Sequence, residues 1–239
     1  MAEYIETFKR KEIKYLLSGE QYEQLFPFMQ EMASVDQYGK TRIQNIYFDT
    51  PDYRLIRTSL EKPIYKEKLR LRTYGDTNGE TNSFIEIKKK YDGIVYKRRV
   101  SGAYDHTFRY LIGKGQPIDD SQISQEIAGF LQMYRNLRPA MRIGYDRIAM
   151  AGIDDPGFRV TFDTKITWST DCLDLREQER GNQILADGWH LMEIKVKDAL
   201  PQKLARKLAE LSIFPNSFSK YGRGYEAMIS KKKGLVGYV

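Results

Sequence analysis

Cysteine and histidine are scarce in this chain of 239 residues, which has one cysteine, Cys172, and two histidines, His106 and His190. A single thiol cannot form an intrachain disulfide, and it excludes a zinc site built from cysteines. The two histidines are isolated in the sequence, so they favour neither a two-histidine metal site nor a Ser-His-Asp or Cys-His pairing. Catalysis through these common side chains is therefore disfavoured.

Long apolar runs are also missing. No stretch approaches the roughly 18–20 apolar residues that a helix needs to cross a bilayer, and the start, MAEYIETFKRKEIKYLL, lacks the apolar core of a signal peptide. There is no GxxxxGK[ST] phosphate loop, and the glycines at 222 and 224 follow no strand pattern that would support a dinucleotide site. We therefore expect a soluble protein of a reducing compartment, the cytoplasm.

Positive charge is abundant: 39 Lys and Arg residues outnumber 32 Asp and Glu residues, which gives a formal charge of +7. This balance suits an anionic partner, which could be nucleic acid, an acidic membrane surface or a phosphorylated small molecule. Hydrophobic residues make up 41% of the chain and aromatic residues 13%, which is enough for a sizeable core. The composition thus predicts a folded, anion-binding protein without choosing the anion.

Strand-like segments dominate the pattern of the chain. Asp92-Gly93 is a turn signal between two of these segments, and a second turn signal lies at residues 74–79. Residues 64–101 are therefore predicted to form a three-stranded meander. Apolar stripes at helical spacing lie between the strands and predict helices near residues 18–32, 123–137 and 201–211, with Pro27 bending or splitting the first. This mixture predicts a largely antiparallel α+β fold. The expected strands are 8–16, 42–49, 64–74, 83–90, 94–101, 141–149, 158–167 and 190–197.

Charged residues alternate with apolar ones in several of these strands. In YKEKLRLRTY, residues 65–74, four cations occupy every second position, so a strand places them on one face about 7 Å apart, at roughly 3.4 Å per residue. Similar rows occur in five other strands. Their members are Arg10, Glu12 and Lys14; Glu86, Lys88 and Lys90; Lys97 and Arg99; Arg159, Thr161 and Asp163; and Glu193, Lys195 and Lys197.

Each charged row taken alone could be the solvated face of a half-buried sheet. Together the rows favour a binding site, because they are mostly cationic with only a few carboxylates among them. Two like charges about 7 Å apart repel by roughly 2 kcal/mol at an effective dielectric constant near 20. Cations with a few carboxylates are the residues that phosphoryl transfer needs, since the cations hold phosphates and a carboxylate-bound divalent metal polarises them.

Eight short motifs in order resemble the VTC domain, the polyphosphate polymerase branch of the triphosphate tunnel metalloenzymes (CYTH-like superfamily). The resemblance implies an antiparallel eight-stranded β-barrel with helices outside and a tunnel lined by basic residues. It also implies transfer of the ATP γ-phosphate to a growing polyphosphate chain, assisted by Mn²⁺ or Mg²⁺. The motifs are RKEIKY (10–15), IYFDTPDY (46–53), YKEKLRLRTYG (65–75), FIEIKKKYDGIVYKRR (84–99), YDR (145–147), FRVTFD (158–163), LMEIKV (191–196) and SFSKYGRGY (217–225).

The same resemblance implies which residues act. Glu193 is expected to be the principal metal ligand, and Ser219 with Lys220 is expected to bind phosphate near the tunnel mouth. Lys66 and Lys68 are expected to line the approach to the tunnel, on parity alone. Glu12, Glu86 and Asp163 are expected to be supporting acids, either in the outer shell of the metal or paired with the cations. The expected tunnel cations are Lys14, Arg70, Arg72, Lys88, Lys97, Arg147 and Arg159.

Three alternatives stay open. The first is a hydrolase of tripolyphosphate or nucleoside triphosphates with the same fold, although that branch usually has the signature ExExK and Arg10 stands here at its first acid position. The second is a non-catalytic module that binds polyphosphate or inositol phosphates, which would be expected to have lost Glu193 or the tunnel arginines. The third, RNA binding, lacks an aromatic stacking signature.

The resemblance predicts one domain over residues 1–230, followed by a basic tail over residues 231–239. Ser217 stands where the family has a basic residue. Eukaryotic relatives carry a phosphate-sensing SPX domain and membrane spans, and this chain shows neither. If the product crosses a membrane, we expect a separate channel protein and an association with the inner face of that membrane through this partner.

Overall fold

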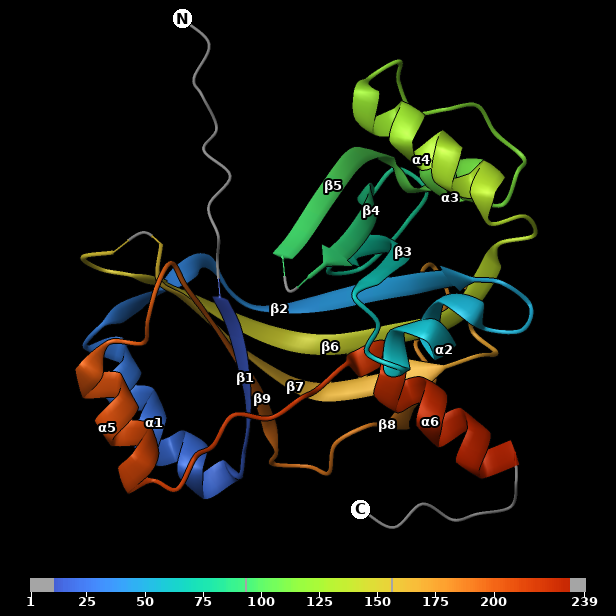
Figure 1. The fold of residues 1–239 in the computed structure, drawn as a ribbon. Coiled ribbons are helices and arrows are strands. Elements are labelled where there is room, and N and C mark those ends of the chain that lie inside the picture. Colours follow the sequence, from blue (N-terminus) through green and yellow to red (C-terminus); the bar gives the residue numbers. More distant parts are fainter. Residues whose placement is uncertain (1–10, 93, 156, 233–239) are drawn as a thin grey trace, which may run out of the picture. The chain divides into compact units, whose positions relative to one another are not determined.

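Nine strands and six helices make up the part of the chain that this computed structural model describes, residues 11–92, 94–155 and 157–232 (Figure 1). The strands are β1 (Lys11–Leu17), β2 (Ala33–Asp49), β3 (Tyr65–Tyr74), β4 (Asn82–Tyr91), β5 (Ile94–Ala103), β6 (Arg138–Gly152), β7 (Arg159–Ser169), β8 (Asn182–Gln183) and β9 (His190–Val196). The helices are α1 (Gly19–Gln30), α2 (Arg54–Leu60), α3 (Tyr104–Leu111), α4 (Gln122–Met133), α5 (Gln202–Glu210) and α6 (Lys220–Lys232).

The strands follow the order β1-β9-β7-β6-β2-β3-β4-β5, with β8 paired to β7. The predicted α+β class with antiparallel pairing is confirmed, and β3, β4 and β5 form the predicted meander. Gly93 of the predicted turn lies outside the described residues, as do residues 8–10 of the first predicted strand and residues 233–239 of the predicted tail.

The predicted closed barrel is wrong for the described residues, because the sheet is open, with β1 at one end of the strand order and β5 at the other. The second edge of β1 is occupied by its own chain. Asn216 donates its backbone N–H to the carbonyl of Lys14 at 2.7 Å, and Tyr15 forms an isolated bridge with Pro215. Since proline has no N–H to donate, this short contact ends the ladder rather than extending it.

Two compact units make up the described chain, and each is treated by itself. The first contains residues 11–41, 146–164 and 185–218, and the second contains residues 42–145, 165–184 and 219–232, apart from residues 93 and 156. The chain passes between them inside β2, β6 and β7. The predicted single domain over residues 1–230 stays a prediction.

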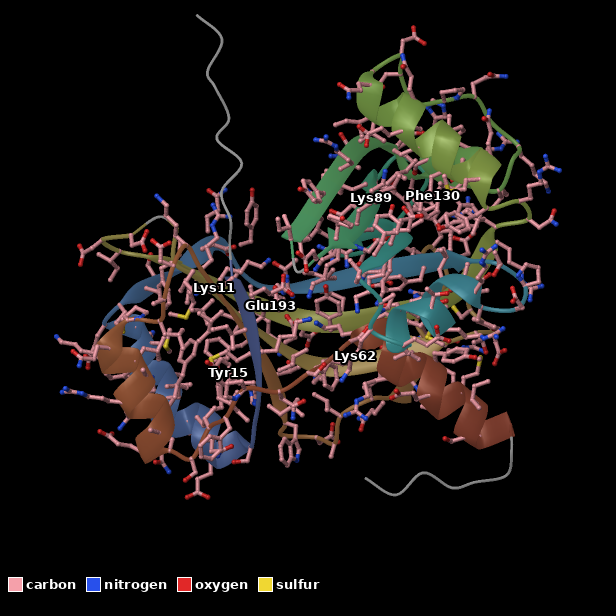
Figure 2. All side chains as sticks on the ribbon, viewed as in Figure 1. Lys11, Tyr15, Lys62, Lys89, Phe130 and Glu193 are labelled. Atoms are coloured by element: carbon pink, nitrogen blue, oxygen red, sulfur yellow. The ribbon has the colours of Figure 1, made fainter. Side chains whose placement is uncertain are left out.

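In the first unit, the apolar side chains of β1, β7 and β9 share one face and pack against α1 and α5. Tyr15 lies among the side chains that fill this space (Figure 2). Helix α1 begins with the predicted capping box, in which Ser18 Oγ accepts from the N–H of Gln21 and the Gln21 side chain accepts from the N–H of Ser18. Pro27 lies inside α1, and the helix is continuous through it.

In the second unit, the apolar side chains of β2, β3 and β4 pack against α3 and α4. Leu69 and Leu71 of β3 are fully buried there, so the alternation read from the sequence is correct and the cations of β3 belong to the other face. Glu67 shares the buried face and is satisfied by two phenols, because Tyr65 and Tyr134 donate to it at 2.6 and 2.5 Å. No helix among the described residues is long and apolar enough to span a membrane.

Candidate functional site

The face of the meander opposite the apolar core of the second unit carries a dense group of cations, which we call the meander cluster. Cross-strand pairing arranges them in rungs: Lys68, Lys88 and Lys97 lie opposite one another on β3, β4 and β5, and Arg70, Glu86 and Arg99 form the next rung. Along this face Glu86 is the one acidic residue of the three strands. The cations of the cluster are Lys66, Lys68, Arg70, Arg72, Lys88, Lys90, Lys97 and Arg99.

Glu86 is the centre of the cluster and is only 1% exposed. Its carboxylate accepts from Arg70 Nε at 2.7 Å and Arg99 Nε at 2.6 Å, and Lys97 Nζ lies 2.7 Å from it. Burial raises the pKa of the Glu86 carboxyl, but the attraction of Arg70, Arg72 and Lys97 outweighs burial and holds the pKa well below its usual range. One ionised carboxylate therefore orders several cations without neutralising them.

Arg72 is buried and held away from solvent by neutral partners. Its Nε donates to Asn45 Oδ1 at 2.9 Å, and its Nη2 donates to Tyr145 OH at 3.1 Å. Asn45 in turn donates to the carbonyl of Ile143 at 3.0 Å, which fixes the amide. Arg72 Nε also lies 3.9 Å from Glu86, but this carboxylate is shared with Arg70, Lys97 and Arg99, so the group keeps an excess of positive charge for an anion.

The beginning of α6 lies beside the meander cluster within the same unit. Lys68 Nζ donates to Ser219 Oγ at 3.1 Å, and Ser219 Oγ accepts from the backbone N–H of Gly222 at 3.1 Å, as an N-cap does. Lys220 Nζ lies 4.4 Å from the centre of the Tyr145 ring. The helix N-terminus and two lysines thus offer further positive potential to an anion.

A buried carboxylate, Asp49, anchors this helix. It accepts the backbone N–H groups of Thr50, Leu55 and Ile56 and the hydroxyl of Tyr221, the last at 2.8 Å. The ring of Tyr221 stacks on Tyr47 with centroids 4.5 Å apart. The IYFDTPDY motif therefore positions α2 and α6, a role that the sequence pattern alone does not reveal.

The first unit carries a second charged group, which we call the Glu193 cluster. Lys14 Nζ lies 3.4 Å from Glu12 and 3.7 Å from Glu193, and Lys195 Nζ lies 3.0 Å from Glu193. Thr161 is the cross-strand partner of Glu193, and its buried Oγ1 makes no hydrogen bond within the described chain. Glu12, Glu193 and Thr161 thus belong to one face of β1, β9 and β7.

The predicted basic residues Arg147 and Arg159 also belong to the first unit. Arg147 makes a bidentate ion pair with the fully buried Asp163, with Nε–Oδ1 and Nη2–Oδ2 distances of 2.6 and 2.7 Å. Arg159 is exposed and lies opposite Lys195 across the β7–β9 pairing. Asp163 therefore supports a cation, one of the two roles predicted for the supporting acids.

A divalent metal fits the Glu193 cluster by its donor set. Mg²⁺ and Mn²⁺ prefer oxygen ligands, and Mg²⁺ commonly uses one or two carboxylates together with substrate phosphates. Two carboxylates and a hydroxyl oxygen that lacks a partner meet that requirement. No group of three His, Cys, Asp or Glu side chains suited to a metal occurs among the residues described. Waters and substrate phosphates usually supply the other ligands of Mg²⁺.

Three functional candidates were not chosen from the sequence. Arg99 belongs to a charged row and ends the quoted motif over residues 84–99, but it was given no role. Tyr47 accepts from Arg70 Nη1 at 3.2 Å, and Thr161 faces Glu193. The parity of β5 is the signal that would have identified Arg99. Tyr47 and Thr161 lie within quoted motifs, but their contacts with Arg70 and Glu193 depend on pairing between distant strands, which a single sequence does not show.

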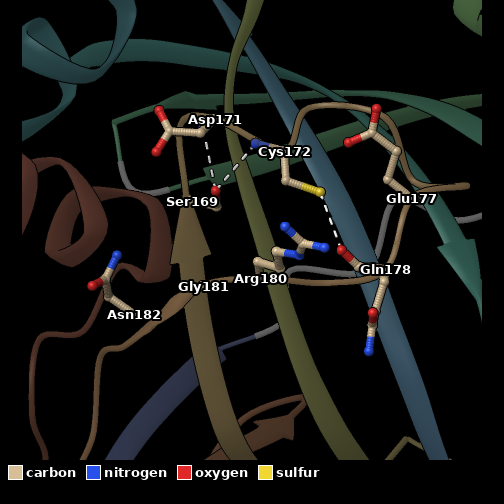
Figure 3. A pocket seen from close by; sticks show the side chains of 8 residues that line it. All are labelled: Ser169, Asp171, Cys172, Glu177, Gln178, Arg180, Gly181 and Asn182. Atoms are coloured by element: carbon tan, nitrogen blue, oxygen red, sulfur yellow. Dashed lines mark hydrogen bonds between the residues drawn. The ribbon is translucent and has the colours of Figure 1, made fainter.

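A cavity of about 680 Å³ lies around Cys172 in the second unit (Figure 3). The Cys172 thiol donates to the carbonyl of Gln178 at 3.4 Å, and the buried Arg142 binds the carbonyls of Asp174 and Glu177 at 3.0 and 3.1 Å. These contacts shape the segment between β7 and β8. The cavity is lined by Ser169, Asp171, Cys172, Glu177, Gln178, Arg180, Gly181 and Asn182, none of which belongs to either charged cluster.

The sequence profile of the VTC domain family matches residues 9–229. The chain belongs to the VTC domain family. No protein of curated function matches it at a significant level. The motifs quoted from the sequence all lie within the matched span, and so do both charged clusters of this VTC domain.

Solved structures with similar folds share little sequence with this VTC domain. A protein from Hippeastrum, described as an adenylyl cyclase with a dominant triphosphatase activity, is 14% identical with a TM-score of 0.51, over 90% of this chain and 95% of that one. Proteins from Vibrio parahaemolyticus and Bacillus halodurans described as adenylate cyclases are 12% and 13% identical, each with a TM-score of 0.47. These matches cover 94% and 97% of this chain and 98% and 94% of those chains. The Hippeastrum protein supports the fold.

Burial lowers the pKa of Lys97 to about 8, against the opposing attraction of Glu86. Anion binding needs the charged ammonium, so above about pH 8 a proton must be taken up on binding, and affinity should fall by up to about tenfold per pH unit. Metal-free ATP serves as the anionic probe, because its phosphates are already ionised in that range. Titration calorimetry from pH 7 to 10 measures the loss of affinity, and Lys97→Arg, which keeps its charge, should bind almost independently of pH. An equal loss of affinity in the wild type and in Lys97→Arg would show that Lys97 is not the group that takes up the proton.

Proposed function

We propose that this VTC domain is an ATP-dependent polyphosphate polymerase, which transfers the γ-phosphate of ATP to the end of a polyphosphate chain. The observation that carries the proposal is the meander cluster, with eight cations and one acid on one face of three strands. Lysines directly opposite one another destabilise a sheet. A face built this way suits a ligand with many negative charges in a row.

The reaction is an in-line displacement. A terminal oxygen of the chain attacks the γ-phosphorus, the bond to the bridging oxygen of the β-phosphate breaks, and ADP leaves with the electron pair. Arg70, Arg72 and Arg99 neutralise charge on the transferred group and hold it in line. Ser219 and Lys220 at the start of α6 bind a further phosphate, as do Lys68, Lys88 and Lys97.

In this proposal the Glu193 cluster holds the divalent metal, Mn²⁺ or Mg²⁺. When bound, the ion neutralises phosphate charge as a Lewis acid. Glu193 and Glu12 supply the carboxylates, and Lys14 holds both in place while adding its own charge. Arg147 and Arg159 are assigned to phosphate, with Asp163 orienting Arg147.

Incubation of the pure protein with ATP and Mn²⁺ should give ADP and long phosphate chains, resolved on a gel that separates polyphosphate from orthophosphate. Arg70→Ala and Arg72→Ala should each weaken nucleotide binding by roughly 10–100-fold, because a charge-assisted contact contributes about 1.5–3 kcal/mol. Release of orthophosphate alone would refute the polymerase. Full turnover in both variants would refute the assignment of the meander cluster as the nucleotide site.

A second candidate is a hydrolase of triphosphates, which the triphosphatase activity of the Hippeastrum protein favours. It would use the same cations but let water attack the terminal phosphorus. The product gel separates the two functions, since a hydrolase yields orthophosphate and no chain.

A polymerase that consumes ATP would work in the cytoplasm. If its product crosses a membrane, a separate channel protein would have to supply the path, and the domain would meet the inner face of the membrane through that partner. Co-purification of the full chain with a membrane protein tests this arrangement.

A further inference from the structure

The cations of the meander cluster are distributed unevenly along the strands. Beyond Arg72, the positions toward one end of the meander are occupied by uncharged residues: Phe84 and Ser101 lie on the same rung, and Tyr74, Asn82 and Ala103 follow. Toward the other end the charge continues, through the rung of three lysines to Lys66 and Lys90, which we call the outer rung. The positive track therefore has a direction.

The outer rung is poor in negative charge. Lys66 and Lys90 are direct cross-strand partners, and the third position of the rung is Val95, which is 41% exposed. Lys66 Nζ donates to the carbonyl of Ser59 at 3.1 Å, a neutral partner. Burial, and then the nearby charges of Lys90 and Lys62, lower the pKa of Lys66. Two lysines pair here although like charges opposite one another are unfavourable.

We propose that Lys66 and Lys90 form a subsite for the product chain, and that growing polyphosphate leaves the meander at the end marked by the paired Tyr65 and Tyr91. This inference rests on the proposed function. The outer rung lies four residues along β3 from Arg70, about 14 Å at roughly 3.4 Å per residue. A chain of several phosphates spans that distance, whereas a triphosphate held at Arg70 and Arg99 does not reach the outer rung.

The direction follows from the charge asymmetry. A polyanion gains nothing beyond Arg72, where the face becomes aromatic and uncharged, but it meets five further lysines on the way to the outer rung. These are Lys68, Lys88, Lys97, Lys90 and Lys66. Binding at this subsite therefore depends on the length of the phosphate chain and not on the identity of the nucleotide.

Binding by the full chain in EDTA tests the subsite, with tripolyphosphate and a long-chain linear polyphosphate as probes over a series of salt concentrations. The double variant Lys66→Gln/Lys90→Gln should lower the slope of log affinity against log salt by about 1.4 for the long chain, at about 0.7 per lost contact to a single-stranded polyanion. The tripolyphosphate slope should not change. The matched control is Lys89→Gln/Lys114→Gln, which removes the same charge, with Lys89 on the opposite face of β4 and Lys114 in a loop.

Equal slopes for wild type and the outer-rung variant would overturn the proposal, and so would an equal loss in the control variant, which would mean that only net charge matters. With ATP and Mn²⁺, the outer-rung variant should make shorter chains than the control variant does. If no chain forms with any protein while the difference in binding persists, the polymerase fails and the subsite stands.

Discussion

Replacing Glu86 with Gln should lower the free energy of unfolding by about 3 kcal/mol, because the change leaves several cations around one buried neutral amide. This is the low end of the usual range, since the side chains of Arg99 and Lys97 are 34% and 44% exposed and can recover some hydration. Chemical denaturation measures the loss. The same variant should bind tripolyphosphate at least about tenfold more tightly, because the phosphate no longer competes with a carboxylate for Arg70 and Arg99.

The matched control for this prediction is Glu126→Gln, which removes a carboxylate from a half-exposed pair with Arg98 at 3.4 Å. That change should cost less than about 1 kcal/mol. Added tripolyphosphate should stabilise Glu86→Gln more than the wild type, since stabilisation by a ligand grows with the logarithm of its affinity. Equal stability of the two variants would show that Glu86 does not hold the cluster together.

Replacing Glu193 with Gln should reduce metal-dependent turnover by about a thousandfold or more. The substitution keeps the size of the side chain but removes the charge that would bind the metal, and the Lewis-acid contribution of a bound ion amounts to several kcal/mol, at about 1.4 kcal/mol for each factor of ten. Steady-state ADP release measured against Mn²⁺ concentration shows the effect. The fold should be retained, because the Glu193 amide can still meet Lys195 and Lys14 through its oxygen.

Glu210→Gln is the control for Glu193, since Glu210 is exposed at the end of α5 and pairs only weakly with Lys207 at 3.3 Å. Its metal dependence should equal that of the wild type. The loss of turnover in Glu12→Gln should lie between those of Glu193→Gln and Glu210→Gln, and its apparent metal affinity should be weaker than that of the wild type. If Glu193→Gln keeps the wild-type response to Mn²⁺, the Glu193 cluster does not bind the metal.

Much of the fold follows from patterns that a single sequence displays. The alternation in β3 correctly assigned Leu69 and Leu71 to the core, and the capping box at Ser18 marked the start of α1. Strand β2 begins nine residues before the predicted strand. The prediction missed residues 33–41, ASVDQYGKT, because they are mostly polar and show no apolar alternation. Helices α2, α3 and α6 were not predicted, since their apolar stripes are short or interrupted by glycine.

The site was predictable to a similar degree. Parity placed the cations of β3, β4 and β5 on one face, because the period of a strand is fixed. It could not show that Glu86 is shared among Arg70, Arg99 and Lys97, since that depends on the register between three strands. Register also decides that Thr161 lies opposite Glu193. Such pairings between distant segments leave no mark in one sequence.

The two ends of the strand order are protected against pairing with another molecule in different ways. At β1 the free edge is covered by Pro215 and Asn216, a steric block that salt and pH do not change. At β5 the edge carries Lys97, Arg98 and Arg99, whose repulsion between two copies weakens as salt rises. We therefore expect self-association through β5 to depend on ionic strength, whereas the contact of Pro215 and Asn216 with β1 does not.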